Sequence, residues 1–488
     1  MLKKAILYFL FFGIFPFELM SIGINPTFDT IPPNIIVFIA DDISWNDFGC
    51  YGNKDVQTPN IDGLAEGGLR FDNAILTTSS CSPSRISIMT GRYPHNTGAA
   101  ELHTEPKRNF SSIASQLKNK GYHTGQAGKW HMGDLLRNGF DVIHDNGKAN
   151  GDGGEDMWLP ALKDRDKSRP FFFWFASMDA HRPWGANNFS GTHLPETVEV
   201  PKTLVNDGPT KIDIARYYDE IKRFDHHIGQ VVTLLKKEGQ YDNTLILIMA
   251  DNGRPFPRDK TRMYDSGLKT PFIAHWPNKI KKGVSKALIS IMDLAPTILE
   301  VCGAETPKSF QGRSFKKLLT NPAASFRNYA FGEHNWHDHE AHERVIRTSE
   351  YLYILNSRPK YANQGPADAL KSPSFQALKQ EKIDGSLTEA QNDVFLKPRS
   401  MEELFKLSTD TNQYDNLLGN NTYQDIHITL RTILEKWMIE TGDSIPDNLT
   451  GDWYTRDDGS RIEEGFQTRG VMPGLKHKAD LIDASGPF

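Results

Sequence analysis

Residues 80–94, SCSPSRISIMTGRYP, hold side chains suited to attack on a sulfate or phosphate ester. Cys81 comes first, and Pro83 is tolerated in a first helical turn, so the segment predicts a short helix that begins at Cys81. Backbone N–H groups at a helix start favour an anion, and Arg85 lies one turn further along the same face. A nucleophile with a fixed cation beneath it fits that chemistry. A buried structural cysteine and a cysteine thiolate nucleophile are the alternatives.

Two pairs of oxygen-bearing side chains each follow an apolar run. Asp41 and Asp42 follow NIIVFIA, and Asp251 and Asn252 follow TLILIMA. Continuous β-branched runs are typical of strands covered on both faces of a parallel sheet. Ligands bind at the carboxyl ends of such strands, so the four side chains are expected at one edge. Alone, each pair is more typical of a turn or helix cap. Together they suit Ca²⁺ or Mg²⁺ better than zinc.

The cysteine segment closely resembles the signature of the type I, formylglycine-dependent sulfatase family. That signature, C-x-P-x-R followed by T-G-R, is matched by CSPSR and by residues 90–92. The resemblance implies that a formylglycine-generating maturation enzyme oxidises Cys81 to 3-oxoalanine, whose hydrate is the working nucleophile. It also implies one Ca²⁺ per chain. Its ligands would be Asp41, Asp42, Asp251, Asn252 and the modified residue 81.

Other family motifs are matched further along the chain. GKWHMGD matches G-K-W-H-x-G and contains Lys129 and His131, while His181 follows the run PFFFWFA as the H-x-P histidine. KTRMYDSGLKTP resembles K-x-x-x-Y-E-G-G-x-R-x-P, which makes Lys260, not Lys269, the sulfate-binding lysine. Alone, these would be ordinary solvated lysines and histidines.

The resemblance implies an in-line attack by one hydroxyl of the hydrate on sulfur. Arg85, Lys129 and Lys260 would hold the sulfate oxygens and offset developing charge. His181 would protonate the departing oxygen or nitrogen, and His131 would later take a proton from the second hydroxyl.

The cysteine segment and the runs PHNTG and DNGRPFP look most like the heparan N-sulfatase (sulfamidase) branch. We therefore expect an exo-acting sulfatase of a sulfated carbohydrate, such as a glycosaminoglycan or the algal polysaccharide ulvan. Histidines 334, 337, 339 and 342 would form a second metal site, a substrate rim on which Trp336 stacks a sugar, or a solvated loop. The predicted substrate-binding residues are His103, Arg254, His334 and Trp336.

Strands that alternate with helices predict an α/β fold with a mostly parallel sheet flanked by helices. The family resemblance makes that fold alkaline-phosphatase-like. Helices are expected at residues 58–70, 110–118 and 216–237. Short strands at 351–355 and 403–406 and a helix near 423–440 predict a smaller C-terminal α+β subdomain with a small antiparallel sheet, and residues 362–397 are expected to be rich in loops. The predicted domains are a signal peptide at 1–23, a catalytic domain at 24–340 and the C-terminal subdomain at 341–488.

Composition excludes several classes of protein. With 56 Lys and Arg against 61 Asp and Glu, the net charge of −5 argues against a nucleic-acid-binding groove. Three cysteines among 488 residues exclude a disulfide framework. Residues 1–23 have two lysines and then an apolar stretch shorter than the roughly 20 residues of a membrane span. This predicts a signal peptide and a periplasmic or secreted protein with no membrane span in the mature chain; an uncleaved membrane anchor is the alternative.

Two rival functions share these features. A phosphodiesterase or phosphonate monoester hydrolase of the same superfamily also uses C-x-P-x-R. A non-catalytic binder of sulfated glycans would result if Cys81 stayed unmodified, although such a protein is expected to have lost one of the catalytic side chains, and all are present.

Overall fold

The computed structural model describes residues 31–456, 458–461 and 468–488. Within it, Pro32–Phe488 forms one compact unit. The predicted signal peptide lies outside the described residues. Among the residues that are described, no helix combines the length and the apolar character needed to cross a bilayer.

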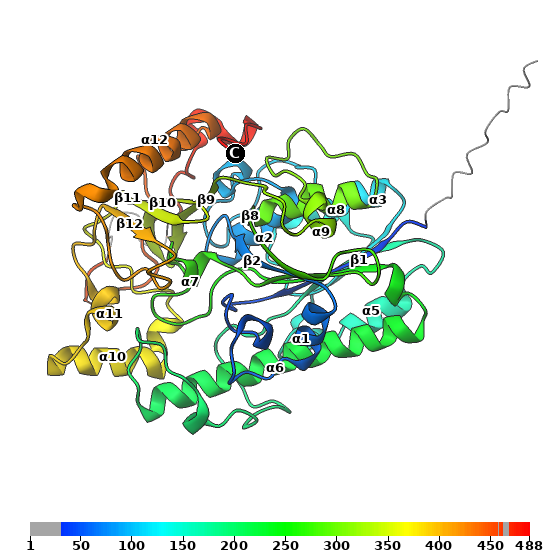
Figure 1. The fold of residues 1–488 in the computed structure, drawn as a ribbon, viewed down its shortest axis with the longest axis horizontal. Coiled ribbons are helices and arrows are strands. Elements are labelled where there is room, and N and C mark those ends of the chain that lie inside the picture. The colour runs from blue at the N-terminus through cyan, green and yellow to red at the C-terminus, as the bar shows by residue number, and fades with distance from the viewer. Residues whose placement is uncertain (1–30, 457, 462–467) are drawn as a thin grey trace, which may run out of the picture. The chain divides into compact units, whose positions relative to one another are not determined.

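An eight-stranded sheet forms the centre of the fold, in the order β4-β3-β5-β1-β6-β7-β2-β8 (Figure 1). Neighbouring strands run parallel except at β7, which is antiparallel to both β6 and β2. The predicted α/β class with a mostly parallel sheet is therefore confirmed. The strands are β1 (Asn34–Ala40), β2 (Leu69–Ile75), β3 (His123–Gly128), β4 (Val142–His144), β5 (Phe171–Ala176), β6 (Thr244–Ala250), β7 (Phe272–His275) and β8 (Gly283–Ser290).

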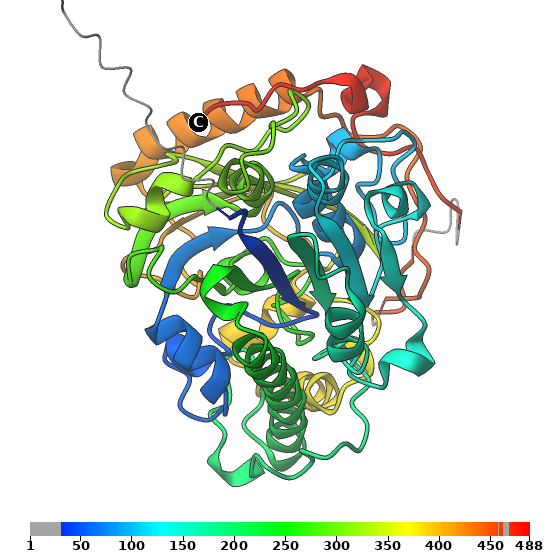
Figure 2. The same cartoon turned by 90° about the vertical axis from the view of Figure 1, so that its right-hand side faces the viewer.

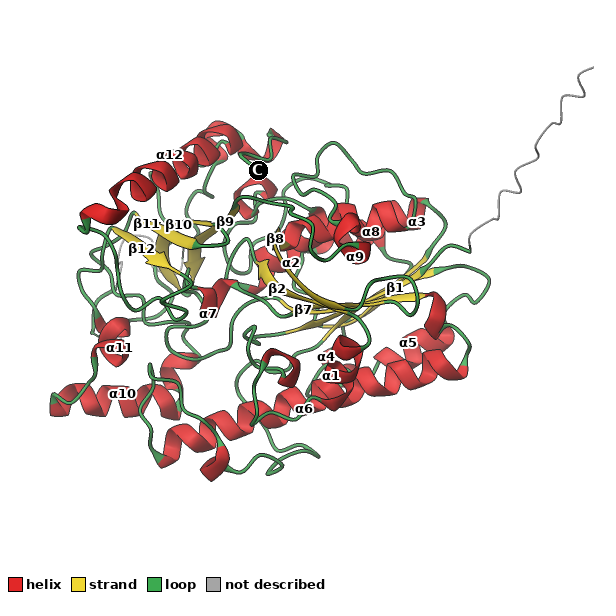
Figure 3. Cartoon of the chain, viewed as in Figure 1, coloured by secondary structure: helices red, strands yellow, loops and turns green. Residues whose placement is uncertain are grey.

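Both faces of this sheet are covered, which explains why its central strands are apolar throughout. Side chains alternate along β1, so Ile35 and Val37 enter one core while Ile36 and Phe38 enter the other. Helices α2, α3, α8 and α9 lie on one side of the strands, and α1, α5 and α6 on the other (Figure 3). The helices are α1 (Pro59–Glu66), α2 (Cys81–Thr90), α3 (Ile113–Asn119), α4 (Gly147–Asn150), α5 (Trp158–Asp164), α6 (Gly208–Lys237), α7 (Asp265–Leu268), α8 (Leu294–Val301), α9 (Lys316–Thr320), α10 (Pro373–Asp384), α11 (Glu389–Asn392) and α12 (Gln424–Thr441).

A second, antiparallel sheet has the order β12-β11-β10-β9. Helix α12 packs on it through Trp437, whose ring stacks on Phe331 with centroids 5.1 Å apart. Figures 1 and 2 place α12 and α6 on opposite sides of the two sheets. The strands are β9 (Ala330–His337), β10 (His339–Arg347), β11 (Tyr351–Asn356) and β12 (Glu402–Lys406). This confirms the predicted smaller C-terminal sheet. The proposed domain boundary at residue 340 falls within β10 and stays a prediction.

Several predicted elements need correction. The helix expected at 58–70 ends at Glu66, because the following glycines lead into β2. Helix α6 begins eight residues before 216, where Asp207 caps it by accepting the Thr210 N–H. The stretch 362–397 contains α10 and α11, so it is less rich in loops than expected. The histidine-rich segment is not a solvated loop, because β9 and β10 carry it in buried positions.

Candidate functional site

Four parallel strands deliver side chains to one edge of the large sheet. Ala40 pairs with Ala250, so the residues that follow β1 and β6 emerge side by side. On the other side of β1, Ile39 pairs with Ala176 of β5, and Ala176 pairs with Gly128 of β3. Parallel strands end at the same edge. The side chains gathered there are Asp41, Asp42, Lys129, His131, His181, Asp251 and Asn252.

Helix α2 places Cys81 at this edge of the sheet. Cys81 is the first residue of the helix and is 2% exposed, and its Sγ lies 3.8 Å from Asp42 Oδ1. Ser80, in the N-cap position, does not cap the helix with its side chain. Its hydroxyl instead lies 2.8 Å from His337 Nδ1. The first N–H groups of α2 therefore lack a side-chain cap from Ser80, which favours an anion at this helix start.

Arg85 lies one turn into α2 and is fully buried. Its Nε donates to Asp251 Oδ2 at 2.6 Å, and its Nη2 lies 3.6 Å from Asp41 Oδ1. The two terminal nitrogens, Nη1 and Nη2, have no hydrogen-bond partner although they are buried. Because buried donors are ordinarily partnered, this guanidinium has N–H groups available for an anion.

Two lysines contact the acidic centre. Lys129 Nζ pairs with Asp41, and Lys260 Nζ donates to Asp42 Oδ2 at 2.7 Å. Together with Arg85, these lysines place three cations next to the three carboxylates at this edge of the sheet, which are Asp41, Asp42 and Asp251. Burial opposes ionisation of Asp41, but the charges of Lys129, His181 and Arg85 outweigh it and hold the pKa of Asp41 well below its ordinary value. Asp41 is therefore an anion in the folded protein.

The oxygen-rich centre fits a hard divalent cation. One ligand atom each from Asp41, Cys81 and Asp251 lie within 4.8 Å of one another. Two oxygens bound to the same Ca²⁺ at 2.3–2.6 Å lie at most about 5 Å apart, so this spacing is compatible with shared coordination. Asn252 Oδ1 is buried without a hydrogen-bond partner and is a free acceptor. Burial raises the pKa of Asp251 to about 6, so a cation there would also have to displace a proton in mildly acidic solution.

Two histidines flank the centre with different environments. Burial, with the nearby Lys129 charge, lowers the pKa of His131 to about 2, so its ring is neutral. His131 Nε2 lies 2.8 Å from His103 Nδ1, while its Nδ1 has no hydrogen-bond partner. His181 Nδ1 must carry a proton, because it donates to the carbonyl oxygen of Arg182. His181 Nε2 is left facing Asp42 and Asp368 at 4.0 and 3.9 Å.

These groups open into a pocket of about 690 Å³. Cys81, Lys129, His131 and His181 line it, and so does the predicted substrate residue His103. Sequence reasoning missed the other wall, to which separate segments contribute side chains without any motif. That wall includes Arg182, Trp184, Arg216, Asp338, Asp368, Lys371 and Tyr454, whereas His337, which also lines the pocket, belongs to the histidine cluster considered above as a substrate rim.

Three predicted substrate residues do not line this pocket. Trp336 is fully buried, and the Arg469 guanidinium lies over its ring, so it offers no face to a sugar. Arg254 is held by Asp259 at 2.7 Å and Asp47 at 3.2 Å, which leaves it no free charge for a neighbouring sulfate.

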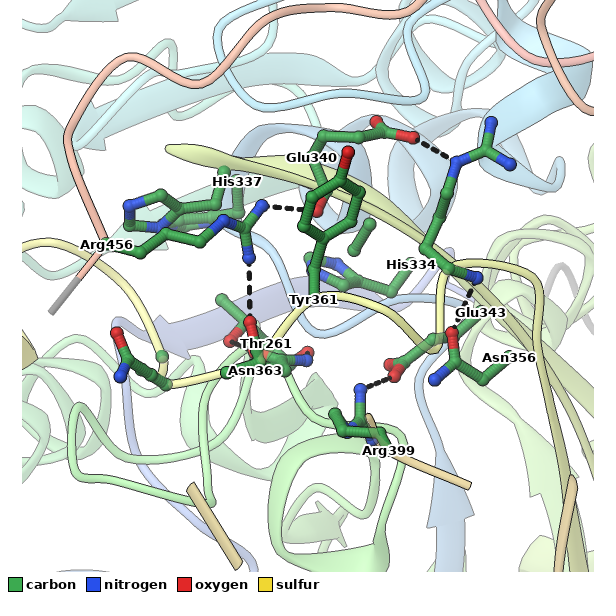
Figure 4. A pocket seen from close by; sticks show the side chains of 16 residues that line it. Thr261, His334, His337, Glu340, Glu343, Asn356, Tyr361, Asn363, Arg399 and Arg456 are labelled. Atoms are coloured by element: carbon green, nitrogen blue, oxygen red, sulfur yellow. Dashed lines mark hydrogen bonds and ion pairs between the residues drawn. The ribbon is translucent and has the colours of Figure 1, made fainter. Parts of the chain in front are cut away.

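His334 lines a separate small polar cavity beside Glu343 and Arg399 (Figure 4). Burial lowers the pKa of His334 to about 4. Within the described part of the chain, no group of three potential ligands at metal-binding spacing includes a residue of the 334–342 segment, so a second metal site there is not supported.

Comparisons with known proteins agree with the motifs. The sulfatase family profile matches residues 33–153 and 155–304. A second profile, described as N-sulphoglucosamine sulphohydrolase, C-terminal, matches residues 256–360 and confirms the predicted resemblance to the sulfamidase branch. An ulvan-active sulfatase of Formosa agariphila is 30% identical over 442 residues, which cover 86% of this chain and 82% of that protein. Human N-sulphoglucosamine sulphohydrolase is 29% identical over 460 residues, with coverages of 84% and 91%.

Solved structures share the fold. An enzyme in complex with its substrate D-glucosamine-2-N,6-O-disulfate superposes with a TM-score of 0.64 at 22% identity, covering 84% of this chain and 98% of that one. A phosphonate monoester hydrolase of Agrobacterium radiobacter gives 0.63 at 15% identity, covering 82% and 94%. At these identities the likeness supports the alkaline-phosphatase-like fold alone. The family profile and the relatives go further: the chain belongs to the sulfatase family and is a sulfuric ester hydrolase.

Proposed function

We propose that the mature protein is a secreted or periplasmic sulfatase that removes sulfate esters, or sulfamates, from a sulfated carbohydrate such as ulvan or a glycosaminoglycan. The names of the two relatives support a sulfated saccharide as the substrate class. The predicted signal peptide supports export. The proposed organisation keeps the catalytic domain at residues 24–340 and the C-terminal subdomain at 341–488.

The observation that carries the proposal is the burial of Cys81 at the start of α2 among Asp42, Arg85 and the two lysines. Burial raises the pKa of the Cys81 thiol well above its ordinary value, which disfavours a thiolate nucleophile there. Conversion of residue 81 to formylglycine by a maturation enzyme would supply a hydrate hydroxyl as the nucleophile instead. The rest of the site is suited to a sulfate ester rather than to thiol chemistry.

A calcium ion is the proposed cofactor. Asp41, Asp42, Asp251, Asn252 and residue 81 would hold it, and it would supply positive charge next to the sulfate and lower the pKa of the attacking hydroxyl. The all-oxygen side chains and the free Asn252 Oδ1 support this assignment.

The chain's own cations would bind the sulfate. Arg85 has two terminal nitrogens without hydrogen-bond partners, and Lys129 and Lys260 each place an ammonium group at the same centre. Preorganised donors of this kind stabilise charge that develops on the oxygens in the transition state. Because these cations are already fixed by Asp41, Asp42 and Asp251, little reorganisation is needed at the moment of reaction.

The two histidines would move protons. His181 has its Nδ1 proton engaged by a backbone carbonyl, so Nε2, which faces the pocket, would donate a proton to the departing oxygen or nitrogen. His131 is neutral and has a free Nδ1, so it would accept a proton from residue 81 when sulfate is released.

The proposal is tested by sulfate release. The protein would be produced with and without a formylglycine-generating enzyme and assayed on a panel of defined sulfated saccharides, with an aryl phosphate diester and an aryl phosphonate monoester as rival substrates. We expect sulfate release only from the matured protein, with a higher kcat/KM on a saccharide sulfate than on either phosphorus ester. A preference for a phosphorus ester, or equal activity without maturation, would contradict the proposal.

A further inference from the structure

We propose that Arg216 and Lys371 form a second anion-binding subsite in the wall of the active-site pocket, which recognises a further anionic group on the saccharide. This inference deepens the proposed function and rests on it. The chemical class is a second sulfate or a uronate carboxylate, carried on the sugar that is cut or on its neighbour. Neither residue belongs to a sequence motif discussed above.

The charge state of the pocket points to these two residues. Among the cations that line it, Lys129 is paired with Asp41 and Arg182 with Asp213. Arg216 and Lys371 are both exposed, and neither forms an ion pair with any residue in the described part of the chain. An unpaired guanidinium on a pocket wall is well suited to a sulfate or carboxylate, because its planar fork matches their oxygens.

A buried polar link joins α6, which carries Arg216, to the first turn of α10, which begins two residues after Lys371. Asp213 of α6 accepts two hydrogen bonds from Arg182 at 2.8 Å each and a third from the Ser374 hydroxyl of α10. Arg216 follows Asp213 by almost one helical turn, and Lys371 precedes Ser374 by three residues. The link therefore ties both cations to the backbone that carries His181, the residue before Arg182.

An aromatic ring completes the same part of the wall. Tyr454 lines the pocket and is 45% exposed, and Lys371 Nζ lies 5.7 Å from its ring centroid. This contact orients the lysine without neutralising its charge. The exposed ring also gives a sugar an apolar face to lie against.

Three carboxylates line the pocket, and Asp213 among them is paired with Arg182. Asp338 accepts the Ala367 N–H at 2.9 Å, and Asp368 lies 3.9 Å from His181 Nε2. Asp338 Oδ2 also lies 3.9 Å from His337 Nε2, and in the described part of the chain neither of these two carboxylates forms an ion pair with Arg216 or Lys371. Carboxylates accept sugar hydroxyl protons and repel anions, so the second anionic group is directed toward Arg216 and Lys371.

The test compares matched substrates in the matured enzyme. One pair is D-glucosamine-2-N,6-O-disulfate against the two monosulfated glucosamines. The other is a sulfated disaccharide with a uronate against its carboxyl-reduced form. The variants are Arg216→Ala, Lys371→Ala and the conservative Arg216→Lys and Lys371→Arg. Lys237→Ala is the control, because it removes an exposed cation from the far end of α6, about 30 Å along the helix.

We expect each alanine variant to lower kcat/KM on the dianionic partner about tenfold more than on the monoanionic one, the effect of losing a charge-assisted hydrogen bond. The lysine and arginine exchanges should keep part of the preference, and Lys237→Ala should match the wild type. The pair that responds identifies the group as sulfate or carboxylate. Equal losses on both partners would overturn the subsite while leaving the proposed function intact. Wild-type enzyme that releases sulfate from none of the probes would overturn the proposed function and the subsite with it.

Discussion

Lys260 Nζ lies 2.7 Å from Asp42 Oδ2, and both side chains are buried. The other lysine of the same motif, Lys269, points elsewhere: its Nζ lies 3.7 Å from the ring centroid of Trp45. The resemblance of this stretch to the family motif predicted Lys260, not Lys269, as the sulfate-binding lysine. The geometry places Lys260, and not Lys269, at the acidic centre.

Replacing Lys260 by alanine should lower kcat/KM by about 10²–10³, because one preorganised donor to the sulfate is lost. Lys269→Ala is the matched control and should keep the specific activity of the folded protein. Steady-state sulfate release from a chromogenic aryl sulfate measures both. A Lys269→Ala loss as large as that of Lys260→Ala would contradict the assignment.

Cys81→Ala should abolish turnover, and Cys81→Ser should stop after at most one sulfation per molecule, since a serine lacks the second hydroxyl needed to release sulfate. Single-turnover and steady-state measurements on the same preparation separate the two behaviours. The mass of the residue-81 peptide from the wild-type protein shows whether conversion has taken place. Sustained turnover by Cys81→Ser would rule out the hydrate mechanism.

Removing calcium should lower both activity and thermal stability. A cation that binds only the folded protein adds about 2.7 kcal/mol to the free energy of unfolding at a free concentration 100 times its Kd. Chelation followed by a Ca²⁺ titration, monitored by thermal unfolding, measures this. Asp251→Asn should remove most of the response, while Asp242→Asn, just before the opposite end of β6, should retain it. An unchanged melting temperature after chelation of the wild type would count against the site.

The pH dependence of stability should change when Glu220 is replaced by glutamine. Burial, together with the Asp179 charge, raises the pKa of Glu220 to about 9. The folded-state pKa is above the ordinary value of 4.5. The contribution of Glu220 to the free energy of unfolding is therefore fully present below pH 4.5 and is lost as the pH rises through about 9.

Between these limits the free energy of unfolding of the wild type should fall by about 1.4 kcal/mol per pH unit relative to that of Glu220→Gln, whose side chain does not titrate. Melting temperatures of both proteins at pH 6, 7.5 and 9 give the difference. Parallel curves would show that Glu220 is already ionised in the folded protein at neutral pH.

The strands of the site could be predicted from sequence because they are apolar on both faces. The run TLILIMA gave β6 with its bounds unchanged, and NIIVFIA gave β1. Strand β9, AFGEHNWH, was not predicted from the sequence, because its buried side chains include the polar residues Glu333, His334 and Asn335. Glu333 and Asn335 are buried with hydrogen-bond partners, such as His95 at 2.8 Å from Glu333, and hydropathy does not detect such pairs.

The proposed catalytic centre could likewise be predicted from motifs, whereas the opposite wall of the pocket could not. Cys81, Lys129 and His181 stand in short patterns that resemble a known family. Arg216 and Lys371 belong to no such pattern. They face the pocket where α6 meets α10, through the Asp213–Ser374 hydrogen bond between positions 161 residues apart and through buried apolar side chains such as Phe375. Trp336 was predicted to stack on a sugar because its side chain is aromatic, but its ring packs against Trp453 and is buried.

If Cys81 is converted as proposed, its burial would also set the order of events in the biosynthesis of the enzyme. At 2% exposure, at the start of a helix whose ten residues are all buried, the thiol is out of reach of a second macromolecule once the chain has folded. The maturation enzyme proposed above would have to act on the chain while residues 80–94 are still extended. Folding would then end the period in which conversion is possible. The yield of active protein would depend on the relative rates of modification and folding, and chains that fold unmodified would stay inactive.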